Sequence, residues 1–219
     1  MRILALDAAL ARCAAAVVID QQLIAVRQEN AAIGHAALLP VMTEAVLDEA
    51  RLSASDLDLV AVTVGPGSFT GIRAALALAH GLALAVGVPV VGVTVGEALA
   101  DALPYLGHRS LWSVIDSRRG RVFLERSGSV VAVALDALPM PDGGVALAGD
   151  AAPAVAARLA ARDVDVMLTD ARLPMVRHVA VVAEQRAVGQ RPPREAQPLY
   201  VDPPEARLPA GGLRPPPVG

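Results

Sequence analysis

Residues 3–28, ILALDAALARCAAAVVIDQQLIAVRQ, contain three short apolar segments separated by turns of only a few residues. The segments run from Ile3 to Asp7, from Cys13 to Ile19 and from Leu23 to Gln28. Connections this short force neighbouring strands to run antiparallel. The chain therefore opens with an antiparallel meander whose first strand ends in an aspartate.

Helices and strands alternate after this meander. Apolar residues recur at helical spacing over His35–Ala50. Buried strands are predicted at Leu59–Val64 and Val88–Val95, on either side of a helix of small residues at Thr70–Val86. A strand–helix–strand unit of this length gives parallel strands with a right-handed crossover. Residues 1–103 thus predict one lobe with the order βββαβαβ.

The second half repeats this order in a shorter form. Leu111–Asp116 is again an apolar strand that ends in Asp, and a hairpin follows around Ser127-Gly128. Asp7 and Asp116 therefore occupy matching strand ends, which an internal duplication explains. The parts predicted after the first lobe are a smaller lobe at 104–191, a final helix at 174–190 that packs back on the first lobe, and a Pro-rich tail at 192–219.

Two lobes that each open with such a meander are typical of the two-lobed, actin-like α/β fold (ASKHA), with RNase-H-like repeats and here a degenerate second lobe. In that fold, hairpin loops hold phosphates through backbone amides and small hydroxyl residues. The loop after Asp7 reads DAAL, without Gly or hydroxyl, and the loop after Asp116 reads DSRRG, with bulky arginines. We interpret Asp7 and Asp116 as a vestigial nucleotide cleft, and turn capping is their simpler role.

Composition excludes several kinds of chemistry. All 19 basic residues are Arg, so the chain has no lysine for a Schiff base or a P-loop. The single Cys13 leaves no intrachain disulfide and no CxxC site. A net charge of −3 argues against strong RNA binding by this chain alone. The apolar run Ala74–Val95 is broken by Gly and Pro, so we expect a cytoplasmic protein with no membrane segment.

Other catalytic interpretations are poorly supported. A two-metal nuclease needs clustered carboxylates, but Asp7 and Asp116 lie on different lobes. Ser68 lacks the GxSxG spacing of a hydrolase nucleophile, and its place before a helix predicts an N-cap. The four histidines include no pair at i, i+3 or i, i+4, the spacing of a helical metal site. No catalytic residue and no metal site are predicted on this chain.

Two features of the helix at 70–86 indicate an interaction surface. Arg73 lies in the first turn, where the helix dipole disfavours a cation, so we expect it to meet a carboxylate of this chain or of a partner. Gly71, Ala75 and Ala79 form a ridge of small residues at i, i+4 spacing, which lets another helix approach closely. With the helix at 35–50 alongside, the ridge predicts a helical dimer interface.

The run GPGSFTGIR, residues 65–73, resembles the signature of the TsaB (YeaZ) family, which takes part in making threonylcarbamoyladenosine (t6A) at position 37 of tRNA. ILALD at 3–7, HAALLP at 35–40, DSRRGRVF at 116–123 and PLY at 198–200 fit the family in the same order, over roughly residues 2–205. The residues of the family's motif loop are Gly65, Pro66, Gly67, Ser68 and Thr70.

The resemblance implies a non-catalytic paralogue of the transferase TsaD that activates TsaD by forming a heterodimer with it. It also implies a homodimer when the chain is alone, the ATPase TsaE as a further partner, and tRNA bound only through the complex. No cofactor is expected on this chain, while ATP and a metal ion are expected on partner subunits. Of TsaD's metal-binding HxxxH only His35 is present, because Leu39 stands at the second position. The implied interface residues are Leu38, Leu39, Met42, Val46, Gly71, Arg73, Ala75 and Ala79.

Two departures from the family pattern bear on this interpretation. Ala8 and Ala9 replace the Ser or Thr that usually follows the first Asp, and Asp202 stands where the terminal motif usually has Arg. An alternative function is a small-molecule kinase or ATPase that uses the interlobe cleft, which predicts nucleotide binding that is lost on Asp7→Asn. A third idea, a protease, finds no nucleophile–base pair in the sequence.

Overall fold

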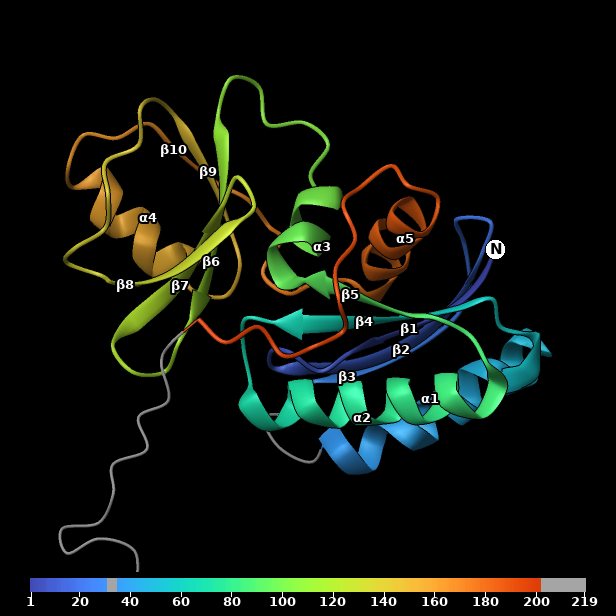
Figure 1. Cartoon of the computed structure of the whole chain (residues 1–219). Coiled ribbons are helices and arrows are strands. Elements are labelled where there is room, and N and C mark those ends of the chain that lie inside the picture. Colours follow the sequence, from blue (N-terminus) through green and yellow to red (C-terminus); the bar gives the residue numbers. More distant parts are fainter. Residues whose placement is uncertain (31–34, 202–219) are drawn as a thin grey trace, which may run out of the picture.

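The computed structural model describes residues 1–30 and 35–201, without the side chain of His35. These residues form two lobes, each built around a five-stranded mixed sheet (Figure 1). The expectations for His35 as a ligand, for Asp202 and for the rest of the tail lie outside the described residues.

The first sheet has the strand order β3-β2-β1-β4-β5. Its first three strands form the predicted antiparallel meander, and β4 and β5 continue the sheet in parallel with β1. The elements of this lobe are β1 (Arg2–Asp7), β2 (Arg12–Ile19), β3 (Gln22–Asn30), α1 (His35–Ala50), the 3-10 turn η1 (Ala54–Asp56), β4 (Leu59–Gly65), α2 (Phe69–Val86), β5 (Val90–Thr94) and α3 (Val95–Asp101).

Helices cover both faces of this sheet (Figure 1). Successive side chains of β1 point to opposite faces, so Leu4 and Leu6 pack with α1 and α2 while Ile3 and Ala5 pack with the last helix, α5 (Val176–Ala187). All of these β1 side chains are fully buried. The first lobe therefore has a core on each side of its sheet, and α1 and α2 form one outer layer of the molecule.

The second sheet repeats the first. Its order, β10-β9-β6-β7-β8, is again a meander followed by two strands parallel to the meander's first strand. Its elements are β6 (Ser110–Asp116), β7 (Arg121–Arg126), β8 (Ser129–Ala134), β9 (Val145–Ala148), α4 (Ala152–Ala160) and β10 (Val166–Leu168). A loop joins β8 to β9 where the first lobe has α1, so the second lobe is the reduced copy that the sequence predicted.

The short helix α3 was not predicted; its first residue, Val95, was assigned to the end of the preceding strand, and residues 96–101 were given no element. The side chain of Thr94 accepts a hydrogen bond from the Glu97 amide over 3.0 Å, and the Glu97 carboxylate accepts one from the Thr94 amide over 2.8 Å. This reciprocal pair is a capping box, which starts a helix directly after β5. The T-x-x-E spacing was therefore the available signal.

Candidate functional site

The turn between β4 and α2 packs tightly on the β1–β2 loop. A Cβ atom at Gly67 would lie 2.1 Å from the carbonyl oxygen of Ala9, so only glycine fits there. The Ser68 amide donates to the same oxygen over 2.7 Å. The Ser68 side chain accepts from the Gly71 amide over 3.2 Å, which confirms the predicted N-cap of α2. Gly67 and Ser68 therefore attach the β4–α2 turn to the β1–β2 loop.

Asp7 is a buried group that organises the same loop. Its Oδ1 atom accepts hydrogen bonds from the Ala9 amide over 3.1 Å and from the Thr63 hydroxyl over 2.6 Å. Ala8 and Ala9 are fully buried. Asp7 therefore caps its turn. The amide and the carbonyl of Ala9 both form hydrogen bonds inside the protein, so they are not available to a phosphate.

Asp116 occupies the matching strand end in the second lobe but is exposed. Its Oδ1 atom accepts from the Arg118 amide over 2.7 Å, and its own amide donates to Oδ1 of Asp150 over 2.8 Å. Burial raises the pKa of the Asp150 carboxyl above its ordinary value, and the negative charge of Asp116 raises it further. The β6–β7 hairpin, with Asp116, Arg118 and Arg119, and the β9–α4 loop, with Asp150, thus lie at the boundary between the lobes.

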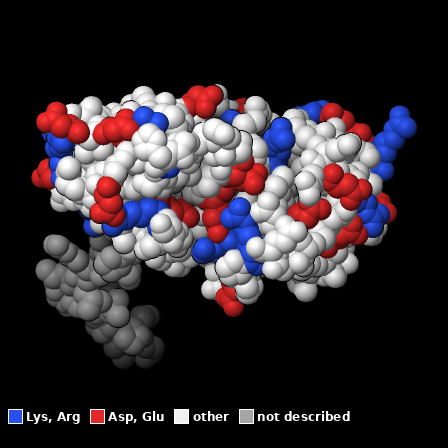
Figure 2. All heavy atoms as spheres, turned by 90° about the horizontal axis from the view of Figure 1, so that it is seen from above, with Lys and Arg blue, Asp and Glu red and all other residues white. Residues whose placement is uncertain are grey.

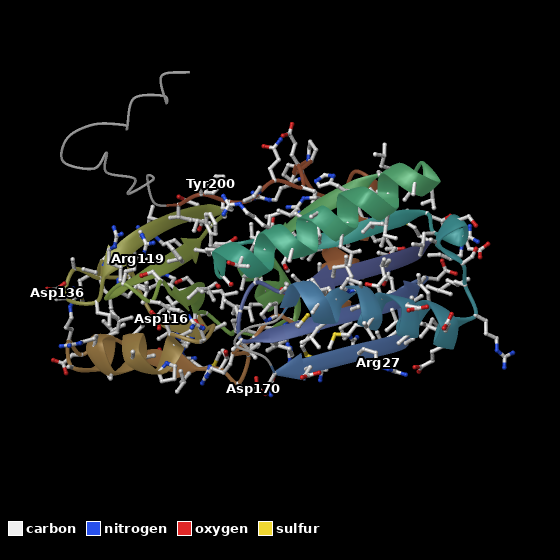
Figure 3. All side chains as sticks on the ribbon, turned by 90° about the horizontal axis from the view of Figure 1, so that it is seen from below. Arg27, Asp116, Arg119, Asp136, Asp170 and Tyr200 are labelled. Carbon is white, nitrogen blue, oxygen red and sulfur yellow. The ribbon has the colours of Figure 1, made fainter. Side chains whose placement is uncertain are left out.

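A cleft of about 850 Å³ lies between the lobes. Its walls are the β1–β2 loop and the start of α2, the β6–β7 hairpin, and the chain segment that ends at Val201. Figure 3 shows Asp116, Arg119 and Tyr200, which line this cleft from both lobes. Asp7 does not line it, so the structure brings only one of the two predicted aspartates to the cleft.

Arg73 lies in the cleft wall and contacts aromatic groups of this chain; of the two partners expected for it, a carboxylate of this chain is not among its contacts in the described residues, and a carboxylate of a partner stays a prediction. Its Nη2 donates to the Tyr200 hydroxyl over 2.6 Å. Its guanidinium carbon lies 3.2 Å from the centre of the Phe69 ring and 5.5 Å from that of Tyr200. Its Nη1 atom is buried and has no hydrogen-bond partner among the described residues. One cation is therefore held between two aromatic side chains.

The segment Arg194–Val201, here called the C-terminal strap, brings Tyr200 to this place. It follows α5 and crosses the first lobe towards the cleft (Figure 1). The carbonyl oxygen of Arg194 accepts from the Gly92 amide over 3.3 Å, and the Leu199 amide donates to the Val64 carbonyl over 2.8 Å. The strap has no regular secondary structure, but hydrogen bonds attach it to β4 and β5.

The residues implied for the partner interface lie mostly inside the first lobe. Leu38 and Arg73 are half-buried. The six others are buried, since α1 and α2 turn them towards the sheet: Leu39, Met42, Val46, Gly71, Ala75 and Ala79. These six therefore form core contacts beneath the helices, and the outward surface of the helices consists of other residues.

The outward surface of α2 is largely apolar, whereas α1 exposes Val41 together with the acidic residues Glu44, Asp48 and Glu49. We define the docking face as Val41 of α1 together with Ala77, Gly81, Leu84 and Ala85 of α2, all of them exposed. Leu84 is 87% exposed and Val41 is 66% exposed. After Arg73, α2 has no Asp, Glu, Lys or Arg. Figure 3 looks onto these two helices, and Figure 2 shows the opposite side of the molecule, which carries scattered charges of both signs.

By length and composition alone, α2 would also pass as a membrane span. Core helices of folded proteins pass the same test. Here Ile72, Leu76 and Ala83 are buried in the core of the first lobe, and Gly87, with a left-handed backbone, ends the helix. In this structure α2 is therefore a helix packed on the sheet of the first lobe.

Glu125 of β7 links the second lobe to the start of α3. Its Oε1 accepts from the Thr94 hydroxyl over 2.5 Å, and its Oε2 accepts from the Gly96 amide over 3.0 Å. Burial raises the pKa of Glu125 to about 7, although both hydrogen bonds favour the charged form. A Cβ atom at Gly96 would lie 2.3 Å from Oε2, so the contact requires glycine there. Glu125 was not among the residues predicted from the sequence.

The histidines with described side chains have structural partners or exposed positions. His178 lies 2.7 Å from Asp101, between α5 and α3, and His80 lies 2.8 Å from the Ala196 carbonyl of the strap. His108 is exposed near Asp165. Within residues 1–30 and 35–201, no three His, Cys, Asp or Glu side chains gather in a metal-binding group.

Comparisons with known proteins agree with this architecture. The model of the family described as "TsaD: tRNA N6-adenosine threonylcarbamoyltransferase" matches residues 20–142, more than half of the chain. The tRNA N6-adenosine threonylcarbamoyltransferase of Cereibacter sphaeroides is 45% identical over 86 residues, which cover 36% of this chain and 24% of that protein. Escherichia coli TsaB, a tRNA threonylcarbamoyladenosine biosynthesis protein, is 34% identical over 124 residues, which cover 56% of this chain and 53% of TsaB. The matches thus span about a quarter of the transferase and about half of TsaB.

Among solved structures, YeaZ from Pseudomonas aeruginosa matches over 91% of this chain and 99% of its own, with 26% identity and a TM-score of 0.74. Two meander-led sheets around an interlobe cleft define a two-lobed α/β protein of the actin-like (ASKHA) class. Within that class, the chain belongs to the TsaB (YeaZ) family of TsaD-related proteins, which acts in t6A biosynthesis.

Proposed function

We propose that this chain is a non-catalytic subunit of the complex that adds threonylcarbamoyl to N6 of adenosine-37 in tRNA, and that it acts by docking on a TsaD-type transferase. The transferase then supplies the active site with its ATP and metal ion, and a TsaE-type ATPase joins the pair. The complex binds the tRNA, and the whole assembly is cytoplasmic.

The docking face is the observation that carries this proposal. Its five residues are exposed and apolar, and they span two adjacent helices. Alanine and glycine on α2 allow a partner helix to approach closely, and Leu84 offers a large apolar side chain to bury. An exposed apolar surface of this kind is typical of a protein interaction site.

The paralogy of the partner supports the same face. The TsaD family model spans residues 20–142, which include both α1 and α2, so a TsaD-type partner offers a related pair of helices. Two related surfaces can pair around a twofold or pseudo-twofold axis. A homodimer and a heterodimer therefore use one surface of this chain and exclude each other.

The β1–β2 loop supports a role without catalysis. In an actin-like kinase or ATPase this loop binds phosphate, whereas here Asp7 accepts from Ala9 and the Ala9 carbonyl accepts from Ser68. Gly67 fills the remaining space against Ala9. A kinase mechanism that starts at Asp7 would have to break these contacts first.

The test is size-exclusion chromatography with light scattering of this chain and the TsaD protein of the same genome. We expect a 1:1 complex with the unchanged chain. Ala77→Arg or Leu84→Arg should abolish it, because each puts an unpaired charge into the apolar contact. Ala154→Arg, on an exposed position of α4 in the other lobe, is the matched control and should leave the complex intact. Two folded proteins that elute separately would overturn the proposal.

A further inference from the structure

The few aromatic residues of this chain are concentrated at one place. Of its two Phe, two Tyr and one Trp, both Phe residues and Tyr200 line the interlobe cleft. Phe69 is 67% exposed and Tyr200 is 64% exposed. Exposing large aromatic side chains to solvent is unfavourable in free energy. A planar ligand that covered the rings in this cleft would bury their apolar surface.

Arginines accompany these aromatic rings. Arg73 lies between Phe69 and Tyr200 and has one buried nitrogen without a hydrogen-bond partner among the described residues. Arg118 and Arg119 line the same cleft from the β6–β7 hairpin, and both are exposed. Arg118 and Arg119 of the second lobe therefore line the same cleft as Phe69 and Arg73 of the first lobe.

Asp116 shapes the hairpin that presents these arginines. Its carboxylate accepts from the amide of Arg118, and the Ser117 hydroxyl donates to the carbonyl of Arg121 over 2.7 Å. Arg118 has a positive φ of 58°, a tight-turn conformation that these local hydrogen bonds support. The two Arg side chains thus project from a defined turn at the cleft.

We infer that this rim of the cleft, formed by Phe69, Arg73, Arg118, Arg119 and Tyr200, binds an unstacked nucleotide of single-stranded RNA. Exposed aromatic rings and guanidinium planes stack on bases that lie outside a helix, and arginines neutralise the adjoining phosphates. A base has the planar shape that fits the rings, and a phosphodiester has the charge that fits the arginines.

Two observations favour RNA over a free nucleoside triphosphate. The β1–β2 loop, where the fold would hold a triphosphate, is occupied by Ser68 and Gly67. Tyr200 and Arg119 line the cleft and are both exposed, so a ligand longer than a mononucleotide can extend from the cleft into solvent there (Figure 3 labels both residues). The choice of RNA also rests on the proposed function, in which the substrate of the complex is a tRNA.

The experiment measures fluorescence anisotropy of a labelled single-stranded RNA of about six nucleotides with the full chain. Tyr200→Ala should weaken binding about tenfold, since it removes a stacking partner. Its matched control is Tyr105→Ala, because Tyr105 is 91% exposed and lies outside the cleft. Arg118→Ala should lower the slope of log affinity against log salt by about one, while Arg158→Ala on α4 should not change it.

Three competitors separate the possible ligands. An abasic strand of the same length should compete poorly, since the rim needs a base. Adenosine monophosphate should compete only at much higher concentration. Competition by the mononucleotide at the RNA's own concentration would overturn the choice of RNA, and equal competition by a glutamate-rich peptide would show an acidic protein site instead.

Equal losses in Tyr200→Ala and Tyr105→Ala, or no loss in either, would overturn the rim as the site. The assay uses this chain without the transferase, so its failure is separate from failure of the docking proposal. The rim variants should keep the 1:1 complex with TsaD, because none of the rim residues belongs to the docking face.

Discussion

Gly67 and Gly81 have different surroundings, so replacing each by alanine should change the free energy of unfolding in opposite directions. Gly67→Ala places a methyl group 2.1 Å from the Ala9 carbonyl oxygen, a backbone atom that cannot turn aside. We expect a loss of at least about 1–3 kcal/mol of folding free energy, as for other overpacked sites. Thermal or urea unfolding of the purified variant measures it.

Gly81→Ala is the matched control. A Cβ atom at Gly81 meets nothing within 4 Å, and the residue lies inside α2. Because Ala has the better helix propensity, the free energy of unfolding should rise by about 0.5–1 kcal/mol. If both substitutions changed stability equally, the contact between the β4–α2 turn and the β1–β2 loop would not be a stabilising one.

Ala75 and Ala77 separate the core from the docking face at the same scale. Ala75 is fully buried against the sheet and Ala77 is exposed two residues along α2. Ala75→Trp should lower the unfolding temperature strongly, since a fully buried alanine in a close-packed core leaves no room for an indole. Ala77→Trp should leave the unfolding temperature nearly unchanged. Loss of TsaD binding in Ala75→Trp therefore does not test docking, whereas Ala77→Arg does.

At the scale of elements, the link between β7 and α3 should make stability depend on pH. Burial raises the pKa of Glu125 from its ordinary value of 4.5 to about 7 in the folded chain. The folded state therefore holds this proton more tightly than the unfolded state. The stabilisation is complete below about pH 4.5 and is lost as the pH rises through about 7. Burial is the largest cause of the raised pKa of Glu125. The negative charge of Glu97 raises this pKa further, and the positive charge of Arg194 lowers it.

Glu125→Gln tests this expectation. Glutamine keeps the shape of the side chain and can exchange hydrogen bonds with Thr94 and Gly96, but it does not titrate in this range. The unchanged chain should lose up to about 3 kcal/mol of unfolding free energy between pH 5 and pH 8 relative to the variant. Urea unfolding at the two pH values measures the difference. Parallel pH profiles for the two proteins would contradict the role of Glu125.

The elements also show which parts of the structure were readable from the sequence. The meander, α1, α2 and the repeated order of the second lobe follow from local periodicity and turn length. The side of α2 that faces the core could not be predicted from the sequence. Alanine and glycine occur all round this helix, so no single apolar stripe marks its buried side. Ala75 and Ala79 were therefore assigned to a helical dimer interface, whereas in the structure both are buried in the core of the first lobe. The Arg73–Tyr200 contact joins residues far apart in the chain, which no local pattern indicates.

At the scale of the whole molecule, the two proposed surfaces occupy different places. The docking face lies on the outer side of α1 and α2, and the cleft rim lies where the first turn of α2 meets the second lobe. The same helix thus takes part in both surfaces, with the rim residues at its start and Leu84 in its last turn. A transferase docked along α2 would leave the cleft between the lobes of this chain open to RNA.

The last prediction concerns the assembly state of the whole chain. If the docking face forms both a homodimer and the heterodimer, the two assemblies compete, and the transferase should dissociate the homodimer as its concentration rises. Light scattering during such a titration should show the homodimer replaced by a 1:1 complex, with no assembly containing two copies of this chain. Leu84→Arg should be monomeric alone and should also fail to bind the transferase, because both contacts bury the same side chain. A variant that lost only one of the two assemblies, or a stable complex of two copies of this chain with the transferase, would show that the chain uses two separate interfaces, and α2 would then serve only one of them.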